Sequence, residues 1–114
     1  MEKRIAFRGM DSSPATENFL NEKLAKVEMF LESEKSPVYL DVVLTGGSTS
    51  GQERNIFNVE IRVKGPHFSI IAQEEGYEIF ATIERAVDTA VQEINKMKKK
   101  RLKMERKADS FKGA

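Results

Sequence analysis

The chain has 114 residues, of which 39% are hydrophobic and 32% are charged, a composition typical of one modest globular domain. It has no Cys and no apolar run near the ~20 residues of a membrane helix, which excludes a disulfide framework, a thiolate metal site and a membrane span. The formal net charge of +1 hides an asymmetry, because residues 96–114 hold nine basic and two acidic side chains whereas residues 1–95 hold ten basic and sixteen acidic ones.

The first predicted element is a strand over Lys3–Arg8. Ile5 and Phe7 alternate there with Arg4 and Arg8, which is the period of a half-buried strand. No long apolar stretch follows the basic residues, so this segment is not typical of a signal peptide. We therefore expect a cytoplasmic protein, which the absence of Cys also weakly favours.

A helix of roughly five turns is predicted to begin at Pro14. Ser13 can accept hydrogen bonds from the free amides of the first turn, and Pro14 gives up a donor that the first helical position does not use. Ser36-Pro37 ends the element. Its apolar stripe, which we expect to lie on a sheet, consists of Leu20, Leu24, Val27 and Leu31.

Three further strands are predicted over Val38–Leu44, Ile56–Lys64 and His67–Ala72, each with apolar residues at every second position. The Gly/Ser-rich segment 46–55 lacks the Gly-Lys-Ser/Thr ending of a phosphate-binding loop, and no helix follows it. We therefore interpret this segment as a hairpin connection. Gly65-Pro66 makes the next turn.

Helical spacing returns at Ile79 and continues to Met97. Beyond that residue the faces become almost wholly basic, so we expect the packed helix to end near residues 98–101. The sequence thus predicts an α+β domain over residues 1–98, in the order β-α-β-β-β-α, with a four-stranded antiparallel meander and both helices on one face. Residues 99–114 form a basic tail, either a helical extension or disordered.

Two features could indicate chemistry, and both have simpler interpretations. His67, the only histidine, begins a strand beside Pro66 and has no partner at metal-ligand or triad spacing. Glu74, Glu75, Glu78 and Glu84 could pair for acid/base work or bind a hard cation, but acidic residues near a helix start also favour its positive dipole end. We expect no enzyme, no cofactor and no metal.

Several segments in order resemble the ribosome hibernation-promoting factor and ribosome-associated inhibitor family, also called sigma-54 modulation proteins. The likeness covers residues 4–100 and begins with I-A-F-R-G-M-D-S-S-P-A. The segment E-K-L-A-K-V-E-M-F is similar to the family's E-K-L-x-K-L-E-K-Y, and E-I-F-A-T-I-E is similar to its D-M-Y-A-A-I-D. The ending Q-E-I-N-K-M-K-K-K is similar to Q-x-x-K-x-K-x-K.

The resemblance implies a fold similar to the double-stranded-RNA-binding domain and a non-catalytic role in translation regulation. Such a protein binds the small ribosomal subunit and its RNA, where messenger and transfer RNA bind, and silences or protects idle ribosomes. We expect a monomer and, at this length, a short or divergent member. The residues implied in RNA binding are Lys23 and Lys26, then Lys96, Lys98, Lys99 and Lys100. Weaker candidates, chosen as outward-facing strand residues, are Arg4, Arg8, Arg62 and Lys64.

The chain departs from the family pattern at three of these motif positions. Met29 replaces a third basic residue of the first helix, Glu78 replaces Asp, and Phe80 replaces Tyr. Two alternatives therefore stay open. The protein could be a general RNA-binding domain with a basic arm, or a protein-interaction module that docks through its acidic body or a sheet edge.

Overall fold

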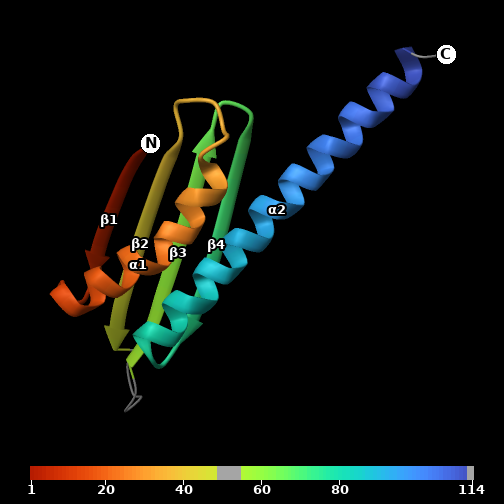
Figure 1. Ribbon diagram of the computed structural model, residues 1–114. Coiled ribbons are helices and arrows are strands. Elements are labelled where there is room, and N and C mark those ends of the chain that lie inside the picture. Colours follow the sequence, from red (N-terminus) through yellow and green to blue (C-terminus); the bar gives the residue numbers. More distant parts are fainter. Residues whose placement is uncertain (49–54, 113–114) are drawn as a thin grey trace.

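Four strands and two helices follow one another in the predicted order, β-α-β-β-β-α (Figure 1). The computed structural model describes residues 1–48 and 55–112, and the side chains of residues 1–47 and 56–104. The elements are β1 (Glu2–Arg8), α1 (Pro14–Leu31), β2 (Tyr39–Ser48), β3 (Asn55–Gly65), β4 (Phe68–Gly76) and α2 (Ile79–Lys112).

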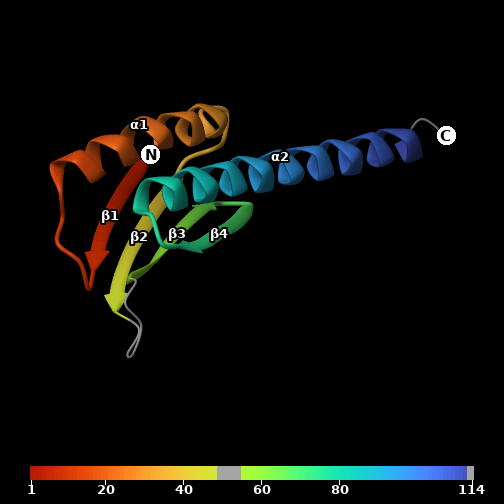
Figure 2. The same ribbon diagram turned by 90° about the horizontal axis from the view of Figure 1, so that it is seen from below.

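The strands form one sheet in the order β1-β2-β3-β4. The pairs β2–β3 and β3–β4 are antiparallel, as the meander predicts, but β1 pairs with β2 in parallel. The reason is α1, which carries the chain back along the sheet before β2 begins, as a parallel pair requires. Both helices lie on the same face, and the other face is uncovered (Figure 2).

The core lies between this sheet and the two helices. The α1 residues Leu20, Leu24 and Val27 are completely buried, as their spacing predicts, and α2 contributes Ile83 and Ile94. The inward residues of the central strands are buried as well. They are Leu40, Val42, Leu44, Val59, Ile61 and Val63.

Both helices begin with side-chain caps. Ser13 accepts a hydrogen bond from the Thr16 amide at 3.5 Å, and Pro14 occupies the first turn of α1 as predicted. At the start of α2, the Glu78 carboxylate accepts hydrogen bonds from the amides of Phe80 at 3.1 Å and Ala81 at 2.6 Å. Glu78 therefore serves the helix start, the simpler of the two interpretations of the acidic residues.

Strand β2 is longer than predicted, because its pairing with β3 continues through Gly46 and Gly47. Backbone pairing needs no side chain, and at Gly46 a side chain would collide with Met10, whose Cβ lies 2.8 Å from a Cβ built there. Gly9 has a positive φ of 64° and approaches the Gly46 carbonyl. The rest of the Gly/Ser-rich connection, residues 49–54, lies outside the described residues.

Helix α2 extends well past the sheet (Figure 1). Ile94 is completely buried and Met97 packs against the core, whereas residues 99–104 are all exposed. The backbone remains helical to Lys112. Neither described helix is long and apolar enough to cross a membrane.

Candidate nucleic-acid interface

The two helices run side by side in the same direction, and this arrangement positions the basic residues. The contacts advance along both helices together. They join Phe19 to Phe80, Lys23 to Glu84, Phe30 to Lys98, and Glu34 to Arg101. The first is an edge-to-face ring pair with centroids 4.6 Å apart.

Lys23 and Lys26 lie beside α2, where they line a shallow pocket of about 440 Å³ together with Glu84 and Asp88. The Lys23 ammonium pairs with the Glu84 carboxylate at 3.3 Å and lies 5.4 Å from the centre of the Phe19 ring. Lys26 is exposed and has no ion pair within the described part of the chain. The two predicted binding residues therefore differ, because only Lys26 is available without breaking an ion pair.

A second basic group lies further along α2 and is here called the basic ridge. Its members are Lys96, Lys99, Lys100 and Lys103. They recur at intervals of three and four residues, so they share one helical face, and all four are exposed. Within residues 96–104 the sequence has no acidic residue, although Lys96 pairs with Glu93 at 3.3 Å. The ridge is thus a row of cations open to solvent.

Lys103 lies on the ridge but was not among the residues predicted from the sequence for RNA binding. The signal that could have found it is its spacing of four from Lys99 and three from Lys100, which continues the ridge by one turn.

The contacts of Lys98 involve the backbone and a ring of α1. Its ammonium donates a hydrogen bond to the Phe30 carbonyl in the last turn of α1, and it lies 5.8 Å from the centre of the Phe30 ring. A cation near the C-terminal carbonyls of a helix stabilises the negative end of its dipole. Lys98 therefore joins α2 to the end of α1, and any role in RNA binding remains a prediction.

The four strand residues proposed as weaker candidates occupy the uncovered face of the sheet, opposite the helices. Arg4 pairs with Asp41 at 3.3 Å across β1 and β2, and Arg62 pairs with Glu60 at 3.3 Å. Arg8 and Lys64 have the same outward register as Arg4 and Arg62 and are exposed. The predicted site is therefore divided between two faces of the molecule.

The two basic groups of the helical face are far enough apart to contact separate phosphates. Glu84 marks the level of Lys23 on α2, and Lys96 follows twelve residues later. At 1.5 Å per residue the separation along the helix is about 18 Å. A rigid polyanion must present phosphates at this interval to engage both groups.

The features considered for catalysis take other roles in the structure. His67 lies in the turn between β3 and β4 and is exposed. Glu74 accepts a hydrogen bond from the Thr89 hydroxyl at 3.0 Å, and Glu75 accepts one from Asn58 at 3.2 Å. Across the residues that the structure describes, no three His, Cys, Asp or Glu residues form a group able to hold a metal ion.

A family model described as sigma 54 modulation protein / S30EA ribosomal protein matches residues 4–102. Two solved structures share the fold. The N-terminal domain of Protein Y from Thermus thermophilus aligns with a TM-score of 0.64 and 22% identity, over 85% of this chain and 99% of that one. A ribosomal subunit interface protein from Coxiella burnetii aligns with a TM-score of 0.65 and 19% identity, over 86% and 98%. No curated protein matches the chain.

Proposed function

Because the chain belongs to the sigma 54 modulation and S30EA ribosomal protein family, we propose that it binds the small ribosomal subunit where messenger and transfer RNA bind, and thereby silences or protects idle ribosomes. Membership in the family supports association with ribosomes in general. The choice of subunit, the RNA channel and the monomeric state are our proposals. Ribosomes work in the cytoplasm, so we place the protein there.

The observation that carries this proposal is the basic ridge of α2. Lys96, Lys99, Lys100 and Lys103 present one exposed cationic face, whereas residues 1–95 are acidic overall. Cations gathered on one helix neutralise phosphates and release condensed counterions, which favours nucleic acid over most proteins. Lys23 and Lys26, which lie beside α2, would add a second contact.

Phosphate contacts of this kind fix position and orientation without reading sequence. The described residues offer a shape for such contacts, because the two basic groups lie about 18 Å apart along α2. Folded ribosomal RNA presents phosphates from several strands at fixed positions and can satisfy both groups together. The inhibition proposed here is therefore steric and non-enzymatic, since a bound protein would exclude other RNA from the channel.

The name of the Coxiella relative, a ribosomal subunit interface protein, is consistent with this proposal. The domain division also stays a proposal. Residues 1–98 would form the ribosome-binding body, and residues 99–114 would form a basic tail that adds affinity.

A second candidate, general RNA binding, is favoured by the exposed basic ridge alone, which would bind many phosphate backbones. The protein-interaction alternative has no comparable support on the helical face. The uncovered sheet face and the strand edges at β1 and β4 would be its docking surfaces.

Competition in a cell-free translation reaction tests the ribosomal proposal. We expect added protein to reduce synthesis in a dose-dependent manner, and an equal mass of simple duplex RNA to rescue synthesis poorly. Simple duplex RNA offers a regular phosphate backbone, whereas folded ribosomal RNA can present phosphates from several strands to both groups together. The measurement is translation yield over a titration of protein, at near-physiological salt.

The matched control is a variant with Lys96, Lys99, Lys100 and Lys103 changed to Gln, which removes four charges from exposed positions. Sucrose-gradient sedimentation then reports whether each protein moves with small subunits. No inhibition at several-fold excess over ribosomes would count against ribosomal silencing, and full rescue by arbitrary duplex RNA would favour general RNA binding.

A further inference from the structure

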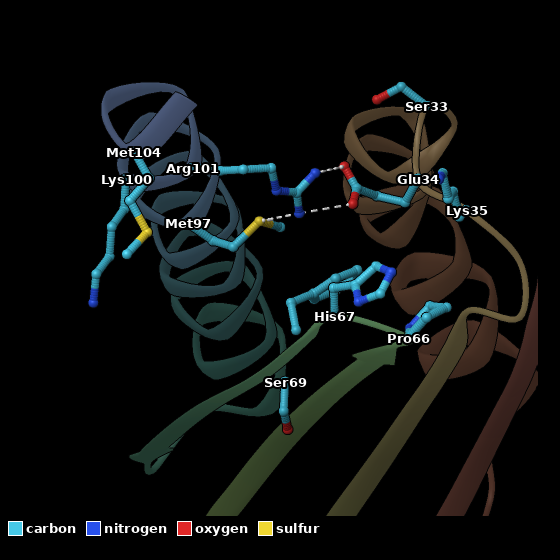
Figure 3. Close-up of a pocket in the computed structure, with 11 residues that line it drawn as sticks. Ser33, Glu34, Lys35, Pro66, His67, Ser69, Met97, Lys100, Arg101 and Met104 are labelled. Carbon is cyan, nitrogen blue, oxygen red and sulfur yellow. Dashed lines mark hydrogen bonds and ion pairs between the residues drawn. The ribbon is translucent and has the colours of Figure 1, made fainter. Parts of the chain in front are cut away.

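A pocket of about 730 Å³ lies under the projecting part of α2, between the end of α1 and the turn that joins β3 to β4 (Figure 3). This volume falls within the range of about 300–1,000 Å³ that is typical of small-ligand sites. Its lining comes from three segments of the chain, namely residues 33–35, residues 66–69 and residues 97–104. The pocket has no part in the contacts at Lys23 and Lys26.

The pocket has an apolar wall. Phe68, Met97 and Met104 line it, and the exposed fraction of Met104 is 65%, so a large hydrophobic side chain faces solvent there. The Phe68 ring lies where a side chain at residue 65 would stand, since a Cβ built on Gly65 would lie 2.3 Å from the ring. The absence of a side chain at Gly65 thus allows the ring its position beside the pocket.

The polar wall has an excess of positive charge. Arg101 and Glu34 neutralise each other through hydrogen bonds of 3.0 and 3.4 Å, and Figure 3 shows Arg101 and Met97 reaching from α2 toward Glu34. Only 6% of the Glu34 side chain is exposed, so its carboxylate is occupied within the protein. Lys35 and Lys100 also line the pocket and have no acidic partner among the described residues.

Hydrogen-bonding groups complete the lining. Ser33, Ser69 and the His67 imidazole border the pocket and carry donors and acceptors. His67 lies between the end of α1 and α2 in the close-up (Figure 3). An apolar wall with one aromatic ring, cations without an acidic partner among the described residues, and the His67 imidazole together suit a ligand with an aromatic ring and a phosphate.

We propose that this pocket binds a nucleoside monophosphate unit, with its base against Phe68, Met97 and Met104 and its phosphate near Lys35, since Lys100 lies on the opposite side of the pocket (Figure 3). Unpaired bases commonly stack on aromatic side chains, which Phe68 supplies here, and Met97 and Met104 add apolar contact beside it. Lys100 belongs to both the pocket and the basic ridge, so RNA held on the ridge passes the mouth of the pocket. Entry of a nucleotide from that RNA rests on the proposed function, because it requires that the protein bind ribosomes or RNA. Binding of a free mononucleotide does not depend on that function.

The test is a nuclear magnetic resonance titration of the full chain with adenosine monophosphate, compared with adenosine alone and with inorganic phosphate. We expect shifts of the amides of residues 33–35 and 66–69 that saturate at lower concentration with the monophosphate than with either part. Equal saturation by phosphate or by adenosine would overturn the proposal, and so would the absence of shifts at 10 mM, about the weakest binding that the site should show.

Two substitutions test the contributions of the polar wall and the apolar wall separately. Lys35→Gln should weaken binding about two- to fivefold, as for an exposed ion pair, and Met104→Ser should weaken it about two- to fivefold through lost apolar contact with the base. The matched controls, Lys3→Gln on β1 and Met29→Ser on α1, change the same residue types outside the pocket and should leave the titration unchanged. Equal effects of the controls would contradict the assignment.

A short single-stranded RNA distinguishes the two sources of the nucleotide. If the RNA shifts the same amides as the monophosphate, the occupant is an unpaired nucleotide of RNA, and if only the monophosphate does so, it is a free nucleotide. Sedimentation of the Lys35→Gln protein with ribosomes is measured in parallel. Ribosome binding without nucleotide shifts would overturn the pocket assignment alone and leave the proposed function in place.

Discussion

Lys23 and Lys26 lie one helical turn apart on α1, yet their surroundings differ. Lys23 pairs with Glu84 and lies over the Phe19 ring, whereas Lys26 is exposed and has no ion pair in the described part of the chain. Affinity gained from a phosphate at Lys23 is reduced by the loss of the contact with Glu84. Lys26 has no such loss, so it should contribute more to binding.

Reversal of Lys26 to Glu should therefore weaken ribosome binding about five- to thirtyfold, because an attraction of up to about 1 kcal/mol becomes a repulsion of similar size. The melting temperature should change little, since the side chain is exposed. Co-sedimentation with small subunits measures the effect. Asn21→Glu, an added charge on the same helix, is the control, and equal losses in both variants would indicate a general charge effect.

Met29 gives a prediction of the opposite sign. Its side chain is 59% exposed and lies one turn beyond Lys26 on α1, at the position where the family resemblance implies a basic residue. Met29→Lys should strengthen binding about threefold to fivefold by one further phosphate contact, worth up to ~1 kcal/mol at an exposed site. Gln73→Lys, which adds the same charge to the uncovered sheet face, should not. A gain in the Gln73 variant would place RNA on the sheet face instead.

At the scale of elements, two contacts fix α2 against the end of α1. Lys98 donates a hydrogen bond to the Phe30 carbonyl, and Arg101 pairs with Glu34. Both contacts lie beyond Ile94, the last completely buried residue of α2. They therefore set the direction of the helix at the point where it leaves the body.

Replacement of Lys98 by Met should show this structural role. Loss of the hydrogen bond and of the favourable charge should reduce the free energy of unfolding by about 1 kcal/mol. The corresponding fall in melting temperature is about 4–8 °C for a domain of this size. Thermal unfolding measures it, with Lys99→Met as the control. If the two variants melted alike and Lys98→Met lost more ribosome affinity, the residue would act mainly in RNA binding.

Deletion of residues 99–114 tests the proposed division of the chain. The truncated protein should remain folded, because the described core residues all precede Lys98, and its melting temperature should fall by less than about 10 °C, the effect of losing roughly one ion pair at Glu34. Ribosome affinity should fall far more. A loss of tens of degrees in thermal unfolding would make the tail part of the domain.

The helices and strands were predictable from the sequence because a layer of helices on one face of a sheet gives the apolar residues of each element a simple repeat. Each element buries only one side, so its apolar residues repeat with the period of that element. The structure confirms the strand alternation at Ile5 and Phe7 and the helical spacing from Leu20 to Leu31. The parallel pairing of β1 was missed because the alternation of apolar residues does not show in which direction a strand runs relative to its neighbour. The extension of β2 through Gly46 was missed because glycine is a poor strand former, and the lack of room for a side chain beside Met10 shows only in the folded structure.

The site was less predictable, because a positive charge in the sequence does not reveal its partner. Lys98 and Lys99 are neighbours, yet one contacts the end of α1 and the other faces solvent. Likewise, the pairing of Lys23 with Glu84 joins residues of two helices that the sequence does not place side by side. The pocket near Phe68 depends on three separate segments and has no signal in sequence order.

For the whole molecule, the segregation of charge predicts a strong response to ionic strength. If five to seven cations of the helical face pair with phosphates, log affinity should fall against log salt with a slope of about −4 to −6. Equilibrium binding to small subunits between about 50 and 200 mM salt measures this slope. The variant with four ridge lysines changed to Gln should have a slope smaller by about 3. A flat titration would indicate an apolar docking surface and favour the protein-interaction alternative.

The exposed turn of α2 just beyond Lys98 has a consequence for the entropy of binding. Residues 99–104 are helical and exposed, with Arg101 paired to Glu34, and like charges at Lys96 and Lys100, or at Lys99 and Lys103, repel along the helix. A helix without packing is marginal in water. Phosphates would remove this repulsion, so ribosome binding should rigidify the turn. Amide hydrogens there should exchange rapidly with solvent in the unbound protein and slowly in the complex, which makes complex formation partly a folding reaction.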